Sequence, residues 1–585
     1  MAPLAARKVE DAGAGTEEMS LPEKPGTGTG NAGDRAQGHA GQSSRRAGLR
    51  ALTAHPADLL IVGGGITGAG IARDAAMRGL RTVLVEQGDL GAGTSSRSSR
   101  LIHGGLRYLE QGRLRLVLEA NRERRVLLRL APHLVRPLPF VFPLHQGDRV
   151  SLWRLAAGMW LYDVLALFRN VAPHRMLSKR ALLAGEPMIR ERGLVGGARY
   201  FDAQCDDARL VLATARSAAS HGAQIATYTA VEALELTDGR VRGARVVDVL
   251  TGERGVVRAA AVVNATGPWT DRVRGLEDPG CRPLLRPTKG VHAVVPRSRL
   301  GHHEAIAFLS PIDGRVMFAL PWGDDSYVGT TDTDTGEPPE TVTARPDDLV
   351  YLLRSINALF PNARLGVEDV RVTWAGLRPL LGDRVSGPSG VSREHAIIEG
   401  PAGMLTIAGG KLTTYRVMAQ DAVDRVLQQF EERSHRVEAR AAPTDREPLP
   451  GGETAEFGPF HRSALEMGLS EDTAEHLVRH YGTETAGIVN LTATHRELQR
   501  RLHPRHPAIE AEVVHAARRE LAERVDDVLV RRVHLYYETP DRGQAAAHRT
   551  AELLGHELGW PSTRMVEEEA RYGALTGVSA AASAD

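Results

Sequence analysis

The feature that most constrains the fold is a glycine pattern, Gly63-x-Gly65-x-x-Gly68, directly after the apolar run DLLIV. The run predicts a buried strand, and ITGAGIARDAAMRG after it has helical spacing. Glycines at these positions permit a tight turn and let backbone N–H groups approach a pyrophosphate at the helix N-terminus. Glu86 ends the next apolar run, RTVLV, about 20 residues on, where an acid binds ribose hydroxyls. The segment therefore predicts a βαβ unit that binds a dinucleotide.

Three later stretches indicate that the dinucleotide is FAD. The first, 93–112, is small, polar and glycine-rich, and suits the wrapping of a flavin diphosphate and ring. The second, VVNATGPWTD, ends a strand at Gly267. The third, AGGKLTTYR, sets two glycines before a helix whose positive end suits the charge of a reduced flavin. The predicted cofactor residues are Gly63, Gly65, Ile66, Thr67, Gly68, Glu86, Ser96, Ser98, Ser99, His103, Gly104, Gly105, Gly267, Gly410, Lys411, Leu412 and Thr413.

Length and composition predict several domains and exclude some functions. A chain of 585 residues exceeds what one hydrophobic core of about 250–300 residues supports. We expect an α/β fold in which a Rossmann-like FAD domain is interleaved with a β-rich α+β substrate domain, followed by an all-α domain. The expected parts are a disordered tail 1–55, the interleaved domains 56–441 with the substrate part at roughly 275–400, a linker 442–453, helices over 454–573 and a tail 574–585. The net charge of +1 argues against bulk nucleic-acid binding.

The sequence predicts neither a metal site nor a secretory signal. The chain has only two cysteines, which cannot form a four-cysteine zinc site or a disulfide framework. No apolar window reaches the ~18–20 residues of a spanning helix. The segment 151–170, rich in aromatics and carrying two arginines, suits an interfacial amphipathic helix, although an ordinary core helix is slightly favoured. We expect a cytoplasmic protein.

Several strings together resemble one narrow family. They are GGGITGAGIARDAA, TSSRSSRLIHGGLRYLE, DDARLVL, NATGPW, TKGVH, GTTDTD, WAGLRPL and GGKLTTYR. They are similar to the FAD-dependent glycerol-3-phosphate dehydrogenases, within the D-amino-acid-oxidase-like flavoproteins. The resemblance runs from about Asp58 to about Gly573 and includes the helical run EAEVVHAARRELAERVDDVLVRR. One departure is Arg100, where lysine is usual in that family.

The resemblance implies oxidation of sn-glycerol 3-phosphate at C2 to dihydroxyacetone phosphate, with hydride transfer to flavin N5 and electrons passing to membrane quinone. It also suggests non-covalent FAD, peripheral attachment to the cytoplasmic membrane and a homodimer. A dianionic substrate needs cations, and arginine binds phosphate bidentately. The expected substrate residues are Arg378, Arg393, Tyr108 and Arg107, and the expected catalytic residues are His292, Arg107 and Lys411. The proton acceptor stays open between His292, His103 and Lys411. Thr330, Thr331 and Asp332 of GTTDTD could form a polar strand end in the pocket, but a plain turn is favoured.

Three other functions remain open at this point. An oxidase of the same substrate would reduce oxygen and release peroxide. An amine or amino-acid oxidase on the same scaffold would need one anchor for a carboxylate, not a cluster of cationic candidates. A non-catalytic flavin protein that docks on membranes as a redox sensor would bind FAD without reacting with glycerol 3-phosphate.

Overall fold

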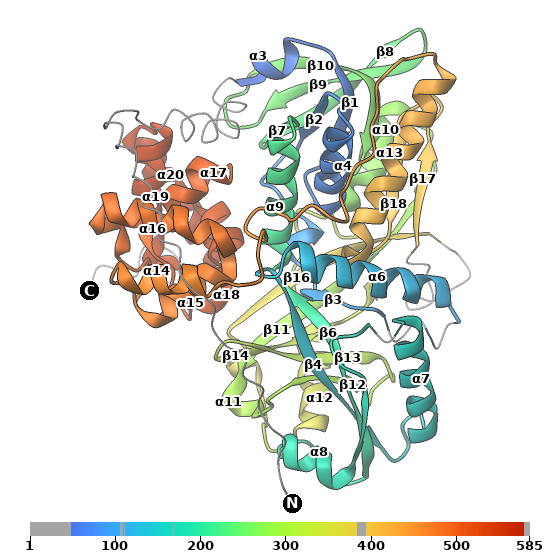
Figure 1. Cartoon of the computed structure of the whole chain (residues 1–585), viewed down its shortest axis with the longest axis vertical. Coiled ribbons are helices and arrows are strands. Elements are labelled where there is room, and N and C mark those ends of the chain that lie inside the picture. The colour runs from blue at the N-terminus through green and yellow to red at the C-terminus, as the bar shows by residue number, and fades with distance from the viewer. Residues whose placement is uncertain (1–47, 106–108, 110–111, 168, 383–393, 578–585) are drawn as a thin grey trace, which may run out of the picture.

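The glycine pattern lies at the carboxyl edge of a mainly parallel sheet in this computed structural model (Figure 1). The structure describes residues 48–105, 109, 112–167, 169–382 and 394–577. Within them, the first sheet has eight strands, with the central order β17-β18-β10-β1-β2-β7, with β9 paired to β10 and β8 paired to β9. The strands are β1 Ala57–Val62, β2 Thr82–Val85, β7 Gln224–Ala226, β8 Thr229–Thr237, β9 Arg240–Asp248, β10 Arg254–Asn264, β17 His395–Glu399 and β18 Leu405–Gly409.

Both faces of this sheet are covered, which explains why β1 is apolar at nearly every position. Every residue of β1 is buried, and it runs parallel to β2 and β10. One face packs against three helices that lie side by side in Figure 1, namely α4 (Ile66–Met77), α9 (Asp207–Ser220) and α13 (Tyr415–Glu432). The other face is covered by β8, β9, α3 (Gly48–Thr53) and α10 (Thr270–Glu277).

The second sheet is antiparallel for most of its width and lies below the first in Figure 1. In the described residues it has ten strands in the order β15-β11-β14-β13-β12-β4-β6-β3, with β16 on β11 and β5 on β6. The strands are β3 Leu101–Ile102, β4 Val135–His145, β5 Arg175–Ser178, β6 Leu194–Cys205, β11 Leu285–Pro296, β12 Ala305–Leu309, β13 Val316–Trp322, β14 Asp325–Gly329, β15 Thr333–Asp334 and β16 Val372–Leu381. The sheet therefore begins well before the expected substrate part at 275–400, because β3 to β6 complete it.

Helices cover this second sheet and the gap between the two sheets. Its helices are α6 Leu114–Leu130, α7 Leu152–Leu165, α8 Lys179–Gly185, α11 Arg297–Leu300 and α12 Pro346–Leu359. The side chains of α8 and α12 share one core with β11, β13 and β14, whereas α7 packs into the core on the other face. No described helix combines the length and the apolarity that crossing a bilayer requires.

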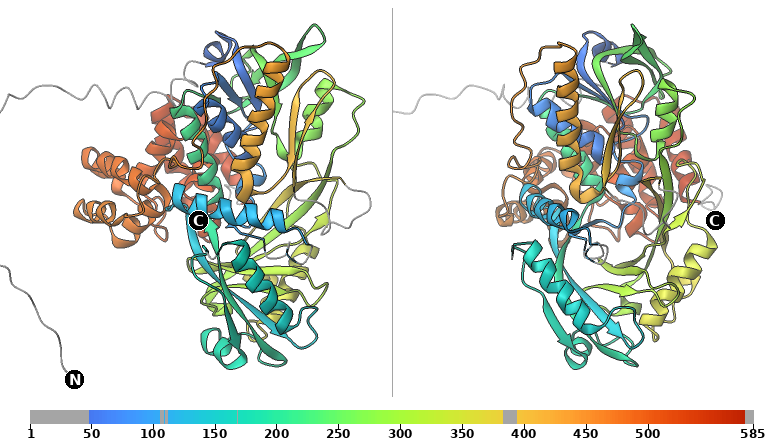
Figure 2. Two further views of the ribbon diagram at one scale, coloured as in Figure 1. Left: turned by 45° about the vertical axis from the view of Figure 1, so that its right-hand side comes forward. Right: turned by 90° about the vertical axis from the view of Figure 1, so that its right-hand side faces the viewer.

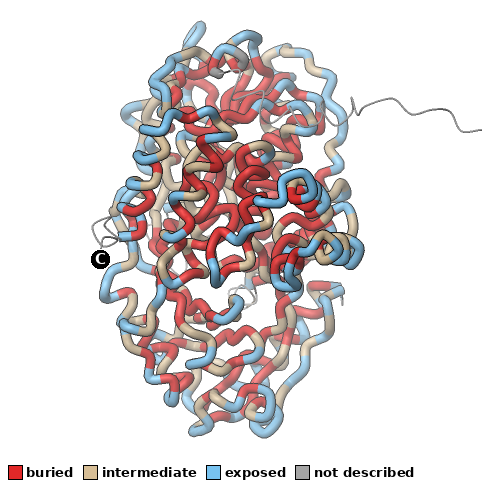
Figure 3. Tube along the Cα trace, turned by 90° about the vertical axis from the view of Figure 1, so that its left-hand side faces the viewer, coloured by how far each residue is buried: buried red, intermediate tan, exposed pale blue. Residues whose placement is uncertain are grey.

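The C-terminal part is helical, as predicted, and packs against the rest of the molecule (Figure 2). Its helices are α14 Gly458–Glu466, α15 Glu471–Tyr481, α16 Thr485–Thr494, α17 Glu510–Arg519, α18 Leu535–Glu538, α19 Gln544–Leu558 and α20 Ser562–Thr576. The hydrophobic core of these helices is continuous with that of the second sheet. In Figure 3 the buried stretches lie inside the molecule beneath exposed helices and turns.

Two sequence expectations need correction. The segment expected to be a disordered tail ends earlier than residue 55, because Leu49 and Leu52 of α3 are buried against the first sheet; residues 1–47 and 578–585 of the two tails lie outside the described residues. The run 510–532 is not one helix. It breaks where Leu521 takes a left-handed backbone (φ +57°), and a π-helical turn Asp527–Arg532 follows. In that turn Arg531 and Arg532 both bind Asp89, which ties the C-terminal helices to the first sheet.

Candidate active site

A cavity of about 920 Å³ lies between the carboxyl edge of the first sheet and the second sheet. Its volume is at the upper end of the roughly 300–1,000 Å³ range of ligand pockets. The turns after β1, β2, β10 and β18 line one end, and strands β11 and β16 line the other. The cavity is therefore shared by the two sheets that the chain builds by interleaving its segments.

The glycine turn after β1 brings backbone close to this cavity. Gly63 has a φ of +112°, a conformation that favours glycine, and its N–H donates to the Val85 carbonyl at 2.8 Å. A Cβ on Gly68 would lie 1.8 Å from the Gly63 carbonyl oxygen, so only glycine lets α4 approach β1 this closely. Gly63, Gly65 and Thr67 line the cavity, and Gly68 supports them from behind. The first-turn N–H groups of α4, which have no partner within the helix, thus offer an anion site.

Glu86 lies at the end of β2 and lines the same end of the cavity. Its two carboxylate oxygens accept hydrogen bonds from the Gly64 N–H at 2.6 Å and the Gly88 N–H at 2.9 Å. Burial raises the pKa of Glu86 above its ordinary value, although these N–H donors oppose the rise. The carboxylate is thus fixed beside the glycine turn, where the sequence predicts it.

The predicted flavin loop contributes both cavity walls and internal supports. His103, Gly105, Ser98 and Ser99 line the cavity. The hydroxyl of Ser98 donates to Asp207 at 2.7 Å, so it holds the loop on the start of α9. Ser96 is buried and does not line the cavity.

Gly104 packs the same loop against Tyr162 and Asp202. A Cβ there would lie 2.2 Å from the Tyr162 hydroxyl oxygen, and its N–H donates to Asp202 at 3.0 Å. Sequence reasoning missed Asp202, which lines the cavity, although a carboxylate inside an apolar strand was a signal for it.

The two later glycine turns line the same end of the cavity as the turn after β1, which is the predicted cofactor end. Gly267 starts a short 3₁₀ turn and lines the cavity. Gly410 has a φ of +81°, and a Cβ there would lie 2.3 Å from the sulfur of Met418. The His103 N–H donates to the Thr413 hydroxyl at 3.2 Å, which joins the flavin loop to the turn after β18. The predicted cofactor residues Gly410, Lys411, Leu412 and Thr413 all line the cavity.

Arg378 lies at the other end, on β16. Its Nη1 donates to Asp332 at 3.2 Å and its Nη2 to the Thr330 hydroxyl at 3.0 Å. The guanidinium lies directly over Gly290, where a Cβ would lie 2.5 Å from Nη2. The expected plain turn GTTDTD therefore supplies the groups that orient this arginine, which sequence reasoning missed. The polar run directly after an apolar strand was the signal.

His292 lies two residues beyond Gly290 on β11, and therefore on the same face of the strand. Its Nε2 is 2.8 Å from the Ser99 hydroxyl oxygen, and its ring stacks on Trp374 with centroids 4.8 Å apart. Burial, aided by the charges of Arg378 and Arg100, lowers the pKa of His292 to about 3. The imidazole is thus neutral at ordinary pH and has the capacity to accept a proton.

The charge of the cavity lining suits anionic ligands. Its described residues include seven arginines or lysines against four carboxylates. They are Arg97, Arg149, Arg154, Arg272, Arg315, Arg378 and Lys411, and Glu86, Asp202, Asp332 and Glu340. Three predicted substrate residues, Arg107, Tyr108 and Arg393, lie outside the described residues.

A mainly parallel sheet with this glycine fingerprint after β1, a carboxylate at the end of β2 and glycine turns after β10 and β18 defines a dinucleotide-binding oxidoreductase. The tight glycine cradle fits a flavin diphosphate. The sequence pattern described as "FAD dependent oxidoreductase" matches residues 58–416, and that of the "C-terminal domain of alpha-glycerophosphate oxidase" matches residues 442–565. The chain belongs to the FAD-dependent oxidoreductase family. This membership confirms the predicted fold class and cofactor.

Named relatives cover most of the chain. Glycerol-3-phosphate dehydrogenase 2 of Mycobacterium bovis is 39% identical over 545 residues, 91% of this chain and 90% of that protein. The aerobic glycerol-3-phosphate dehydrogenase of Staphylococcus aureus is 38% identical over 493 residues, 83% of this chain and 88% of that protein. The crystal structure of the glycerol-3-phosphate dehydrogenase from Bacillus halodurans, complexed with FAD, has a TM-score of 0.78 and 28% identity, and covers 92% of this chain and 98% of that one.

Proposed function

We propose that this protein oxidises sn-glycerol 3-phosphate at C2 to dihydroxyacetone phosphate with FAD as its cofactor. The observation that carries the proposal is that Arg378 of β16 and His292 of the neighbouring strand β11 both line the cavity that the predicted flavin turns also line. The names of the relatives, which cover most of the chain at 38–39% identity, support the same substrate.

The residues divide the work as follows. Arg378, oriented by Asp332 and Thr330, binds the phosphate through its planar fork. His292 accepts the proton of the C2 hydroxyl. FAD, when bound between the glycine turns and the flavin loop, supplies the acceptor for the hydride that leaves C2. Lys411 lies in the turn that follows β18 and stabilises negative charge there.

Substrate binding also prepares His292 for its task. The charge of Arg378 contributes to the low pKa of His292, after burial. A phosphate dianion on Arg378 offsets that charge and so raises the pKa of His292. The imidazole is therefore a stronger base when the substrate is bound, and it carries no charge when the site is empty.

Dye-coupled turnover tests the substrate. Purified FAD-loaded protein, given an artificial electron acceptor, is expected to convert sn-glycerol 3-phosphate to dihydroxyacetone phosphate and to leave glycerol and amino acids unchanged. Turnover of an amino acid instead would favour the amine-oxidase alternative. An oxidase is the second candidate, because the C-terminal pattern is named after alpha-glycerophosphate oxidase. Stoichiometric peroxide without added acceptor would favour it.

We further propose that electrons leave to quinone at a membrane surface on which α7 docks. Trp153 and Trp160 lie on one side of this helix and are 69% and 60% exposed, whereas Leu155 and Met159 are buried. Exposed arginines lie close to this helix, as suits anionic lipid. Arg115 and Arg122 of α6 line one surface hollow with Leu165 and Leu167 at the C-terminal end of α7, and Arg169 and Arg175 follow that helix in the chain. Leu155, Gly158 and Leu161 of α7 line the cavity, so the helix links that surface to the proposed flavin site.

Vesicle flotation tests this docking. The double variant Trp153→Ser/Trp160→Ser is expected to lose at least ten-fold in binding to vesicles with anionic lipid and to keep dye-coupled turnover. The matched control Val566→Ser/Leu575→Ser removes two exposed apolar side chains from α20 and should bind as the parent does. Equal flotation of all three proteins would contradict the proposal. Light scattering of the detergent-solubilised protein tests the homodimer.

A further inference from the structure

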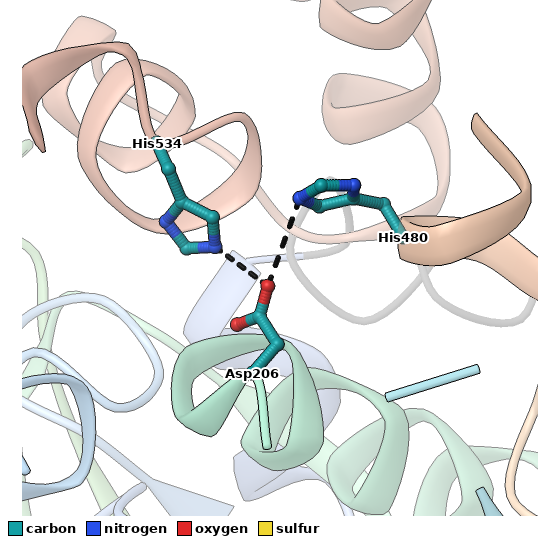
Figure 4. A group of neighbouring side chains, drawn as sticks. All are labelled: Asp206, His480 and His534. Atoms are coloured by element: carbon teal, nitrogen blue, oxygen red, sulfur yellow. Dashed lines mark hydrogen bonds and ion pairs between the residues drawn. The ribbon is translucent and has the colours of Figure 1, made fainter. Parts of the chain in front are cut away.

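Three side chains from separate segments converge where the C-terminal helices meet α9 (Figure 4). Asp206 is the N-cap of α9, and one of its oxygens accepts from the Arg209 N–H at 3.0 Å. His480 lies in the last turn of α15, and His534 follows the π-helical turn. One nitrogen or oxygen from each residue lies within 4.8 Å of the others, and in Figure 4 both imidazoles point at the carboxylate.

The hydrogen bonds of the two histidines determine which ring nitrogen faces the carboxylate as an acceptor. Nδ1 of His480 lies 2.9 Å from the His476 carbonyl oxygen, and Nδ1 of His534 lies 3.0 Å from that of Val530. A carbonyl only accepts, so each Nδ1 carries the hydrogen. In the neutral rings both Nε2 lone pairs therefore face the same oxygen of Asp206, at 3.8 Å and 2.7 Å.

Three acceptors that face one another need a cation between them. A proton on His534 would satisfy only the 2.7 Å contact, because 3.8 Å is too long for a hydrogen bond from His480. A metal ion placed among the three atoms would satisfy all of them at once.

We propose that Asp206, His480 and His534 bind one divalent transition-metal ion of the zinc type, with water at the remaining position. Two imidazoles and a carboxylate form a donor set that suits Zn²⁺. Backbone carbonyls on the second ring nitrogens are the usual partners of metal-binding histidines, because they fix the tautomer and the ring orientation. No motif in the sequence indicates the site, because its ligands come from distant segments.

The buried arginine nearest to the proposed site in the chain is paired with a carboxylate, so its charge does not exclude a divalent ion. The guanidinium of Arg209, the nearest buried cation along the chain, is bound to Glu520 at 2.7 Å and lies over the Tyr481 ring at 4.0 Å.

The ion would connect the C-terminal helices to the flavin loop. Asp206 is followed by Asp207, whose carboxylate accepts hydrogen bonds from the backbone N–H and the hydroxyl of Ser98. Holding the start of α9 against α15 would therefore also hold the loop that lines the cofactor end. This structural role does not depend on which substrate the enzyme oxidises.

Zinc binding to the FAD-loaded enzyme tests the proposal. The protein is treated with a chelator, dialysed and titrated with ZnCl₂, while bound metal is measured by mass spectrometry and stability by the thermal midpoint. We expect one zinc ion per chain and a rise of the thermal midpoint that saturates at that stoichiometry.

Three variants remove one ligand each with little disturbance of the backbone. Asp206→Asn retains the N-cap oxygen, His480→Gln suits a helix, and His534→Asn suits the left-handed backbone of that position (φ +60°). Each of the three variants should lower the affinity for zinc by at least about ten-fold. The control His548→Ala removes a histidine whose two carboxylate partners lie on opposite ring nitrogens, at 2.9 and 3.1 Å, and should bind zinc as the parent does.

Two results would overturn the proposal. In the first, the parent protein binds no stoichiometric zinc and its thermal midpoint does not change with ZnCl₂. That result would mean that a proton alone links Asp206 to His534. The other is an equal zinc response in the parent and in all three ligand variants. Neither result bears on glycerol 3-phosphate oxidation.

Discussion

The two ends of the cavity are built in different ways. The cofactor end consists of backbone turns between parallel strands, and glycines such as Gly68 and Gly410 leave no room there for a side chain. The substrate end consists of side chains, mainly Arg378 and His292, that project from antiparallel strands. Changes at the first end should therefore be all-or-none for cofactor binding, whereas changes at the second should alter rates in a graded way.

The largest effect is expected from Gly68→Ala. The added Cβ would lie 1.8 Å from the Gly63 carbonyl oxygen, so the turn cannot keep its shape. We expect protein without flavin or no folded protein, measured by the ratio of flavin to protein absorbance. The control Gly487→Ala adds the same methyl group to α16, where its Cβ would meet no atom within 4 Å beyond its chain neighbours and its own helix backbone, and should retain its flavin. A yellow Gly68→Ala protein would remove the distinction between the two ends.

The next effect is expected from His292→Gln. Loss of the proton acceptor should lower kcat about 10²- to 10⁴-fold in dye-coupled turnover with little change in flavin content. His302→Gln is the matched control, because His302 is another buried histidine of this region whose Nε2 binds the Ser326 hydroxyl at 2.7 Å, away from the cavity. Parent-like turnover of the His292 variant would assign the proton to another group.

A smaller effect is expected from Arg378→Lys. The change retains the charge but loses the planar fork, so KM for glycerol 3-phosphate should rise about ten-fold to a hundred-fold, in line with a loss of about 1.5–3 kcal/mol for a charge-assisted hydrogen bond. The control Arg286→Lys alters an arginine of β11 that binds Asp334 at 2.6 Å outside the cavity. An unchanged KM in the Arg378 variant would show that the phosphate binds elsewhere.

The smallest effect concerns acid stability. Burial lowers the pKa of His302 to about 4, below the 6.5 of an unfolded histidine. As the pH falls, His302 is protonated in the unfolded chain before it is protonated in the folded protein. The contribution of neutral His302 to the free energy of unfolding is therefore complete above pH 6.5 and falls by about 1.4 kcal/mol per pH unit toward pH 4. The thermal midpoint of the parent should therefore drop between pH 7 and pH 5, and His302→Gln should show a smaller drop. An equal drop in both proteins would contradict this assignment.

The same contrast explains how much the sequence could predict. The turn at Gly63 to Gly68 and the acid Glu86 are local patterns, so their fold and place were predictable. For Thr330 and Asp332 the polar run after an apolar strand was only a weak signal, because their role depends on β14 ending beside Arg378 of β16.

Contacts between distant residues also lay beyond local patterns. Ser98, expected to contact the flavin, lines the cavity and also donates its hydroxyl to Asp207, a residue more than a hundred positions away in the chain. The early strands β3 to β6 joined the second sheet through pairings that no local pattern reveals. Contacts between distant segments thus decided what local periodicity did not.

The central claim is that the two ends of one cavity perform one reaction. Anaerobic titration of the FAD-loaded protein with sn-glycerol 3-phosphate tests it most directly, followed by the flavin absorbance near ~450 nm. We predict that this substrate bleaches the band and that glycerol does not. An unchanged spectrum from intact, FAD-loaded protein would contradict the account.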